Sequence, residues 1–286
     1  MNKTKILPEA IKLLMSDLKS DLKSLSFKKD LTSNNLIKKN SRMEVAIVAR
    51  EEITLCGIFF IQRFISKIDP DLKVKTTFQD GDKIKKNKAI ALISGNSRKI
   101  LGIERTVLNF IQSLSSVSTS TNKIMSLLEK SKTKLLDTRK TLPGLRLMHK
   151  YATFIGGAKN HRMGLFDDIL IKDNHIKVGG GIKKILEVLK KKKITNYKIE
   201  CDTIKQVKDC LEAGAKYILL DNMSPEKIIS SIKLKKKKSI IFEVSGGINL
   251  KNLNKFSKLN ADYISIGYIT QNPEPIDIGM DIIKKL

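Results

Sequence analysis

The hydrophobic positions of the first 130 residues change between helical and strand-like spacing. Ile11, Leu14, Leu18 and Leu22 recur every three or four residues, which places them along one face of a helix. Short apolar runs elsewhere in this part are typical of strands, and a turn at residues 80–82 (DGD) separates two of them. The pattern predicts an α+β segment with helices over residues 1–25, 54–67 and 101–129 and strands over residues 42–49, 73–78 and 89–93.

A different pattern begins near residue 133, where short apolar strands alternate with helices. Each strand ends in a polar residue, and these ends follow one another at intervals of roughly 21 to 35 residues, the length of one βα unit. Near-continuous apolar strands are typical of buried parallel sheets. We count about six such strands, or seven, fewer than the eight of a complete barrel. The polar residues at the strand ends are Asp137, Lys172, Glu200 with Asp202, Asp221, Glu243 with Ser245, and Ser265 with Gly267.

These patterns predict an α/β fold with two domains. The first is an N-terminal α/β sandwich over residues 1–112, and the second is an incomplete (β/α) TIM-like barrel over residues 113–271. Residues 272–286 follow the last barrel strand and are expected to join the first domain. Their apolar side chains need burial there, namely Ile276, Ile278, Met280, Ile282 and Ile283.

The composition excludes several classes of protein. Hydrophobic residues make up 41% of the 286 positions, enough for a substantial core, and no stretch approaches the roughly 18 apolar residues of a membrane span. The N-terminus lacks the apolar segment and cleavage site of a secretory signal. Cys56, Cys201 and Cys210 have no metal-type spacing and are expected to be buried free thiols. We therefore expect a cytoplasmic protein without a membrane partner.

The formal net charge of +26 resembles that of nucleic-acid-binding proteins. However, arginine occupies only eight positions, lysine supplies the rest of the 55 basic residues, and aromatic residues make up only 5%. Specific nucleic-acid contacts favour arginine forks interleaved with aromatic rings. We therefore interpret the lysine runs at residues 85–88, 190–193 and 233–238 as a solvated surface. The alternative, a nucleic-acid-binding barrel, predicts strongly salt-sensitive binding.

The densest chemical pattern lies in residues 137–146 (DTRKTLPGLR) and 156–175 (GGAKNHRMGLFDDILIKDNH). Both segments place positive charge beside strand ends and between glycines, where a surface lysine run is not normally found. A cleft that concentrates cations is suited to a ligand with two or more negative charges. His149 and His175 are expected to have structural roles. The candidate ligand-binding residues are Thr138, Arg139, Lys140, Lys159, His161, Arg162 and Lys172.

Other candidates follow the later strands. Glu200 and Asp221 end neighbouring strands, where carboxylates bind a magnesium ion or sugar hydroxyls, or else pair with barrel lysines. Ser245-Gly246-Gly247 and Ile266-Gly267-Tyr268 follow the last two strands, where barrels commonly bind phosphate through backbone N–H groups. The glycines at residues 179–181 match no nucleotide-binding spacing and are interpreted as a flexible loop.

Taken in order, these segments resemble the quinolinate phosphoribosyltransferase family along nearly the whole chain. The resemblance is most specific through residues 161–175. The segments that carry it are RTVLNFIQSLS (105–115), DTRKTLPGLR (137–146), HRMGLFDDILIKDNHI (161–176), IECD (199–202), ILLDNMSP (218–225), EVSGGI (243–248) and ISIGYIT (264–270).

The resemblance implies a sandwich domain, an incomplete barrel and a specific reaction. Quinolinate and phosphoribosyl pyrophosphate would react with magnesium as cofactor to give nicotinate mononucleotide, pyrophosphate and carbon dioxide in de novo NAD synthesis. It also implies a homodimer with a shared active site, or a higher oligomer. A nicotinate-type phosphoribosyltransferase without decarboxylation is the alternative. The clustered cations favour a dicarboxylate over this monocarboxylate.

The resemblance also implies a role for each candidate residue. Arg139, His161, Arg162 and Lys172 would hold the quinolinate carboxylates, with Arg105 supplied by the other subunit. Thr138 and Lys140 would complete the substrate loop, and Lys140 and Lys172 would neutralise the leaving group. Glu200 and Asp221 would lie beside the ribose and bind the metal. The phosphate loops would be Ser245, Gly246 and Gly247, followed by Ile266, Gly267 and Tyr268.

Overall fold

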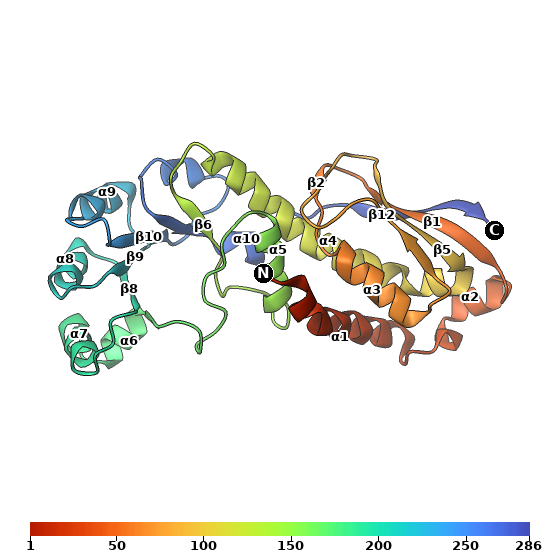
Figure 1. The fold of residues 1–286 in the computed structure, drawn as a ribbon, viewed down its shortest axis with the longest axis horizontal. Helices are drawn as coiled ribbons and strands as arrows, with labels where there is room; N and C mark the ends of the chain where they lie inside the picture. Colours follow the sequence, from red (N-terminus) through yellow and green to blue (C-terminus); the bar gives the residue numbers. More distant parts are fainter. The chain divides into compact units, whose positions relative to one another are not determined.

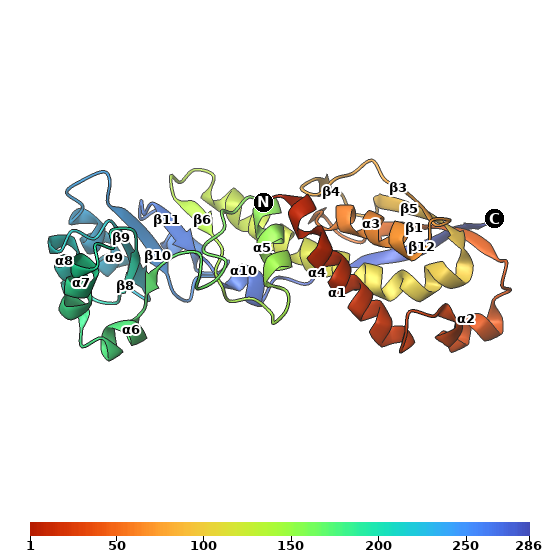
Figure 2. The same ribbon diagram turned by 60° about the horizontal axis from the view of Figure 1, so that its bottom comes forward.

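A computed structural model describes residues 1–286, and the chain divides into two compact units. The first contains residues 1–122, 147–157 and 273–286, and the second contains residues 123–146 and 158–272. Both combine helices with a sheet, as the sequence predicts (Figures 1 and 2). No helix has the length and apolar character needed to cross a membrane.

A four-stranded antiparallel sheet organises the first unit. Its strand order is β12 (Ile278–Lys285), β1 (Arg42–Ala49), β5 (Ala89–Asn96) and β3 (Lys73–Lys75), and β2 (Ile53–Thr54) pairs separately with β4 (Lys83–Ile84). Alternate residues of β1, among them Val45 and Ile47, project into one core shared with the helices. These helices are α1 (Lys3–Leu22), α2 (Leu31–Leu36), α3 (Ile58–Ile68), α4 (Ser97–Leu128) and α5 (Arg146–Ile155), with a 3₁₀ turn at Phe27–Lys29.

The unit boundaries differ from those expected from the sequence. The helix α4 runs without a break through residue 112, and its side chains as far as Val117 belong to the first core. The boundary along the chain therefore falls after residue 122. The helix α5 also belongs to the first unit, because Met148, Tyr151 and Ala152 are buried in that core. The Tyr151 hydroxyl donates a hydrogen bond of 2.6 Å to Asp80 in the same unit.

The C-terminal segment joins the first unit through β12, which pairs with β1 along nearly its whole length. Ile276 and Ile278 are buried, as expected. The expected burial of Ile282 and Ile283 is wrong, since these side chains are 63% and 53% exposed. They lie in the last half of an edge strand, where every residue from position 282 onward is exposed.

Six parallel strands organise the second unit, the number counted from the sequence. Their order is β6 (Lys134–Leu136), β11 (Tyr263–Ser265), β10 (Ile241–Ser245), β9 (Tyr217–Asp221), β8 (Lys198–Cys201) and β7 (Leu170–Ile171). The end strands β6 and β7 do not pair with each other, so the barrel is incomplete. A single bridge from Leu136 to Lys159 extends the pairing beyond β6. The predicted fold class is therefore confirmed.

The helices that connect these strands form where a segment has an apolar face or begins with a residue that caps its N-terminus. The buried residues of α7 (Ile182–Lys191) are Ile182, Leu186 and Leu189, which have helical spacing. The Thr203 hydroxyl accepts a hydrogen bond from the Gln206 N–H, which begins α8 (Ile204–Glu212). The remaining helices are α6 (Asp173–Val178), α9 (Pro225–Lys233) and α10 (Tyr268–Gln271), with a 3₁₀ turn at Leu253–Lys255.

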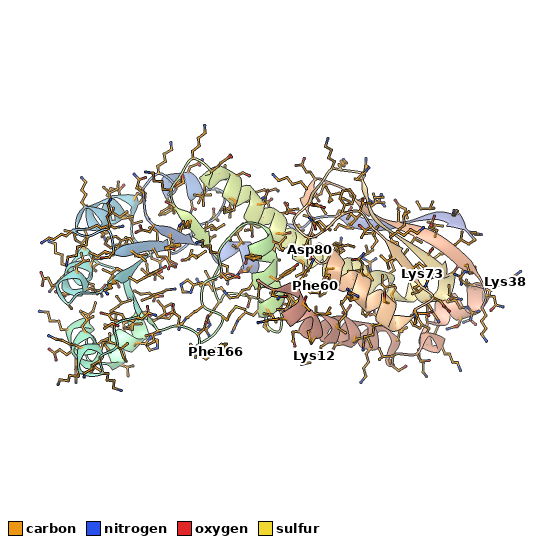
Figure 3. The ribbon with its side chains drawn as sticks, viewed as in Figure 1. Lys12, Lys38, Phe60, Lys73, Asp80 and Phe166 are labelled. Atoms are coloured by element: carbon orange, nitrogen blue, oxygen red, sulfur yellow. The ribbon has the colours of Figure 1, made fainter.

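The lysine runs at residues 85–88 and 190–193 are exposed, as expected, whereas Lys235 in the run at 233–238 is partly buried and pairs with Asp262 at 3.0 Å. Lys12, Lys38 and Lys73 are exposed and extend outward from the first unit, whereas Phe60 is fully buried within it (Figure 3). All three cysteines are free and buried. The exposed lysines thus belong to the solvated surface, and the three cysteines belong to the hydrophobic cores.

Candidate active site

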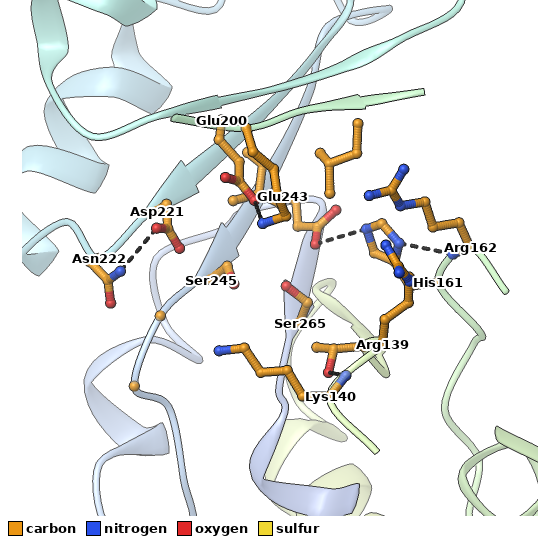
Figure 4. Close-up of a pocket in the computed structure, with 16 residues that line it drawn as sticks. Arg139, Lys140, His161, Arg162, Glu200, Asp221, Asn222, Glu243, Ser245 and Ser265 are labelled. Atoms are coloured by element: carbon orange, nitrogen blue, oxygen red, sulfur yellow. Dashed lines mark hydrogen bonds and ion pairs between the residues drawn. The ribbon is translucent and has the colours of Figure 1, made fainter. Parts of the chain in front are cut away.

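Strand alternation brings the polar strand ends of the second unit into one pocket. Along β9, Ile218 and Leu220 pack into the core against the helices, whereas Leu219 and Asp221 line the pocket. The same alternation on β10 buries Phe242 and Val244 in the core. Glu243 and Ser245, on the opposite face of β10, line the pocket together with Ser265 of β11 and Glu200 of β8 (Figure 4). Lys172, directly after β7, also lines it.

The loop after β6 is fixed by its own polar groups. Asp137 is fully buried, and its carboxylate accepts hydrogen bonds from the His161 N–H at 2.7 Å and the Asn160 amide at 2.6 Å. The Lys140 N–H donates to the Thr138 hydroxyl at 3.0 Å, and the Thr270 hydroxyl donates to the Lys140 carbonyl at 2.6 Å. These contacts hold residues 138–140 at the pocket wall.

His161 and Arg162 come from the segment that Asp137 anchors. The Nδ1 atom of His161 accepts a hydrogen bond of 2.8 Å from the Arg162 N–H, and its Nε2 atom lies 3.5 Å from Glu243 Oε1 (Figure 4). The Arg162 guanidinium donates from Nη1 to the Asp168 carbonyl at 2.9 Å. Both side chains are buried, so the protein holds them in place at the pocket.

Arg139 and Arg162 line one side of the pocket, here called the cationic wall, and the protein does not supply enough negative charge to balance them. Burial lowers the pKa of Arg162, and the positive charge of Arg139 lowers it further. The buried Nε atoms of both arginines have no hydrogen-bond partner. Buried donors of this kind carry a large desolvation cost unless an acceptor reaches them. The wall is therefore suited to a ligand that brings carboxylate or phosphate oxygens.

Lys172 links the cationic wall to the acidic strand ends. Its backbone N–H donates to His175 Nδ1 at 2.9 Å, which confirms a structural role for His175 at the start of α6. Its ammonium group forms an ion pair of 2.5 Å with Glu200. Burial raises the pKa of Glu200, the Lys172 contact opposes this effect, and the charge of Asp221 adds to it.

Glu200 and Asp221 fit a magnesium ion by the chemistry of their donors. Magnesium commonly takes one or two protein carboxylates and completes its coordination with water and substrate phosphates. Asn222 follows Asp221 in a left-handed conformation (φ 52°) and donates to its carboxylate at 2.9 Å. No group of three or more histidine, cysteine, aspartate or glutamate side chains is placed to bind a metal alone. The pair therefore suits a metal that arrives with a phosphorylated substrate.

A second hollow adjoins the pocket at the glycine loops. Gly246 and Gly247, both with positive φ, line it together with Gly267, Tyr268 and Lys140. Ile266 does not line either hollow, because its side chain is in the core and its N–H donates to the Leu136 carbonyl. The backbone of the two loops thus borders the same space as Lys140 does.

Most of the candidate residues meet in these two hollows, and three polar residues of the pocket were not among them. Glu243, Asn222 and Ser265 line it, although only Glu243 and Ser265 carried a signal, as polar residues at strand ends. Arg105 is exposed on α4 in the first unit and does not line the pocket. Lys159 is an exposed residue beside β6. The glycines at 179–181 connect α6 to α7, as the loop interpretation requires.

Comparison with known proteins gives consistent matches along the chain. The family model described as "Quinolinate phosphoribosyl transferase, C-terminal domain" matches residues 117–281, and the corresponding N-terminal domain model matches residues 30–115. The "Probable nicotinate-nucleotide pyrophosphorylase [carboxylating]" of Bacillus subtilis is 38% identical over 258 residues, which cover 88% of each chain. Its counterpart in Methanocaldococcus jannaschii is 36% identical and spans 96% of this chain and 98% of its own.

Solved structures agree with the sequence relatives. The nicotinate-nucleotide pyrophosphorylase of Francisella tularensis superposes with a TM-score of 0.88 at 36% identity, and the match covers 96% of both chains. The enzyme of the same name from Ehrlichia chaffeensis gives a TM-score of 0.88 at 35% identity and covers 99% of both chains.

Proposed function

Because the chain belongs to the quinolinate phosphoribosyltransferase family, as the sequence resemblance predicts, we propose that it carries out the reaction of that family. It transfers the phosphoribosyl group of phosphoribosyl pyrophosphate to quinolinate. The products are nicotinate mononucleotide, pyrophosphate and carbon dioxide, as in de novo NAD synthesis. The chain matches its relatives over most of their length, so the proposal concerns the whole enzyme.

One observation supports this function above the others, namely the paired arginines with unpartnered donors. Arg139 and Arg162 are close enough for the charge of one to lower the pKa of the other, and each has a buried Nε without an acceptor. Quinolinate carries two adjacent carboxylates, and guanidinium groups bind carboxylates through paired hydrogen bonds. Nicotinate, with a single carboxylate, would satisfy fewer of these donors.

The pocket assembles two substrates that repel each other. Arg139 and Arg162, together with His161 and Lys172, hold the dicarboxylate with its ring nitrogen directed at the anomeric carbon of the ribose. The nitrogen attacks as pyrophosphate leaves, and Lys140 at the neighbouring glycine loops neutralises the departing charge. The ring nitrogen then carries a positive charge, which stabilises the carbanion that forms when the adjacent carboxylate leaves as carbon dioxide. The carbanion takes up a proton, so the contribution of the protein is mainly positioning and electrostatics.

Glu200 and Asp221 are the residues that would hold the expected magnesium ion. When bound, the ion supplies positive charge to the phosphate oxygens of the second substrate. The carboxylates also accept hydrogen bonds from ribose hydroxyls. Lys172 orients Glu200 through their 2.5 Å ion pair, and the Asn222 amide orients Asp221 by donating a hydrogen bond of 2.9 Å.

A homodimer with a shared site is part of the proposal. Arg105 is a cation outside the pocket residues, exposed on α4, and the family resemblance assigns it to the site of the other subunit. Each site would then contain one arginine from the partner chain. The expected cytoplasmic location also stays a prediction.

Steady-state kinetics with quinolinate and with nicotinate test the proposed substrate. Wild-type protein with phosphoribosyl pyrophosphate and magnesium should use quinolinate with a far higher kcat/KM than nicotinate. Arg139→Met should lower kcat/KM for quinolinate by about 30- to 1000-fold, the effect of losing one buried charge contact. Arg146→Met is the matched control, because Arg146 is exposed and does not line the pocket. Equal use of both substrates, or equal loss in both variants, would disprove the assignment.

A further inference from the structure

Glu243 has a buried carboxylate in the pocket that Arg139 and Arg162 also line. Its side chain is fully buried on the pocket face of β10, the face that also carries Ser245. The Tyr217 hydroxyl donates to Glu243 Oε2 at 2.6 Å, and His161 Nε2 faces Glu243 Oε1 at 3.5 Å (Figure 4). Burying a carboxylate at such a place is costly unless donors surround it.

The contacts of Glu243 keep it ionised. Burial acts to raise its pKa, but the hydrogen bonds and charge from His161, with those from Ser265 and Tyr217, outweigh this effect, and the pKa is lowered. The carboxylate is therefore a hydrogen-bond acceptor inside the barrel. Since it has no exposure, it acts on a substrate only through the groups that it touches.

The imidazole of His161 is held on both sides by the protein. Its Nδ1 atom accepts from the Arg162 N–H at 2.8 Å, so the ring proton lies on Nε2 and points toward Glu243. The 3.5 Å separation of Nε2 and Glu243 Oε1 is a close contact, longer than a usual hydrogen bond, and Oε1 has no other hydrogen-bond partner. His161 is thus a link between Glu243 and the backbone of Arg162.

The same network reaches Arg162 from its other end. Lys198 lies over the Tyr217 ring, 4.8 Å from its centre, and forms an ion pair of 2.9 Å with Asp168. The Asp168 carbonyl accepts the 2.9 Å hydrogen bond from the Arg162 guanidinium. Contacts running from Glu243 through Tyr217 and Lys198 therefore end at the arginine that His161 also holds.

We propose that Glu243 is a positioning residue for the dicarboxylate site, and that it acts through His161 to fix Arg162 at the cationic wall. His161, which lines the pocket, is the link between Glu243 and Arg162 in this account. The inference rests on the proposed function for the identity of the ligand. Its consequence is that loss of Glu243 weakens binding of the dicarboxylate and leaves binding of the phosphorylated sugar unchanged.

A double-mutant cycle tests the link. The variants are Glu243→Gln, His161→Gln and the two together, each assayed for KM of both substrates and for binding of phthalate by calorimetry. Glu243→Gln should weaken phthalate binding and raise the quinolinate KM by about 10- to 100-fold, the order of effect of removing a charged group that buried donors face. It should change the KM of phosphoribosyl pyrophosphate by less than about twofold. In the His161→Gln background, the same change should have little further effect.

Tyr217→Phe tests the proposal if Glu243→Gln does not fold. It removes the 2.6 Å hydrogen bond and keeps the ring, and it should raise the quinolinate KM by a smaller factor, about two- to tenfold. Tyr263→Phe is the control, since this ring stacks on Tyr217 with centroids 6.2 Å apart and its hydroxyl change leaves the Glu243 contact intact. His161→Asn, whose side-chain oxygen takes the place of Nδ1, should retain more dicarboxylate affinity than His161→Ala.

Two outcomes would overturn the proposal. One is additive effects of Glu243→Gln and His161→Gln on dicarboxylate binding, and the other is an equal loss for both substrates. Phthalate binding is measured without turnover, so it distinguishes this failure from failure of the proposed function. Wild-type protein that binds phthalate but makes no nicotinate mononucleotide would disprove the function alone.

Discussion

Gly246 connects the glycine loop to the metal-binding strand end, and its replacement by alanine tests how closely the two are packed. Its φ is +108°, a conformation that residues with a side chain rarely adopt, and an added Cβ would collide with the side chain and backbone of Asn222. The Asn222 N–H donates to the Ser245 carbonyl at 2.9 Å, and its amide donates to Asp221. Displacing Asn222 therefore moves Asp221 as well.

The expected loss can be worked out from these contacts. Backbone strain at a positive φ costs about 1–3 kcal/mol, and forcing a methyl group into packed atoms costs about 1–3 kcal/mol more. Gly246→Ala should thus lower the free energy of unfolding by about 2–6 kcal/mol. A displacement of Asp221 on the order of 1 Å should lower kcat/KM for phosphoribosyl pyrophosphate about 100-fold.

Gly214→Ala is the matched control for this experiment. Gly214 also has a positive φ (+84°), but a Cβ there meets nothing within 4 Å, and it follows α8 outside the pocket. Gly214→Ala should lower the free energy of unfolding by about 1–2 kcal/mol and leave kcat/KM unchanged. Urea unfolding followed by circular dichroism gives the stabilities, and product formation gives the kinetics. Equal stabilities and wild-type kinetics in both variants would refute the packing argument.

Three further predictions concern subunits, pH and metal. Arg105→Ala and Lys172→Ala proteins should each be nearly inactive, and mixing them after dissociation should restore activity through hybrid dimers with one intact site; no recovery despite proven hybrids would contradict a shared site. Lys99→Met should lower the unfolding free energy by about 0.5–1 kcal/mol at pH 7, because the half-exposed Lys99 pairs with Asp69 at 2.5 Å and lowers its pKa. Urea unfolding measures this difference from wild type, with the exposed Lys12→Met as control. The difference should vanish as the pH falls through the lowered Asp69 pKa, because a carboxyl group with a depressed pKa stabilises the fold only while it is ionised. A difference that persists at acid pH would show that the ion pair is not its cause. Chelation of magnesium should abolish nicotinate mononucleotide formation and magnesium should restore it; full activity in the chelator would rule out the metal role of Glu200 and Asp221.

The barrel strands could be predicted because their sequence signal is local. Each strand is a short apolar run with a polar end, and parallel pairing necessarily brings such ends together, as Glu200 and Asp221 show. The cationic loops were recognisable for the same reason, since Arg139 lies in the loop after β6 and Lys172 follows β7 directly.

Other features depend on contacts between distant residues and could not be derived in this way. Nothing near Glu243 in the sequence indicates that it faces His161, because the contact depends on the order and register of the strands. The helix α5 lies between two barrel segments in sequence, yet its apolar face completes the core of the other unit. Ile282 has the alternation of a buried strand, but its position at the end of an edge strand leaves it exposed.

The most direct test of the central proposal is a single incubation with quinolinate labelled in the carboxylate next to the ring nitrogen. With phosphoribosyl pyrophosphate and magnesium, the protein should release labelled carbon dioxide in equal amount to nicotinate mononucleotide and pyrophosphate. The label should leave only as product forms, because decarboxylation requires the positively charged ring nitrogen. Absence of the nucleotide at high enzyme concentration, or a nucleotide that retains the label, would contradict the proposed function.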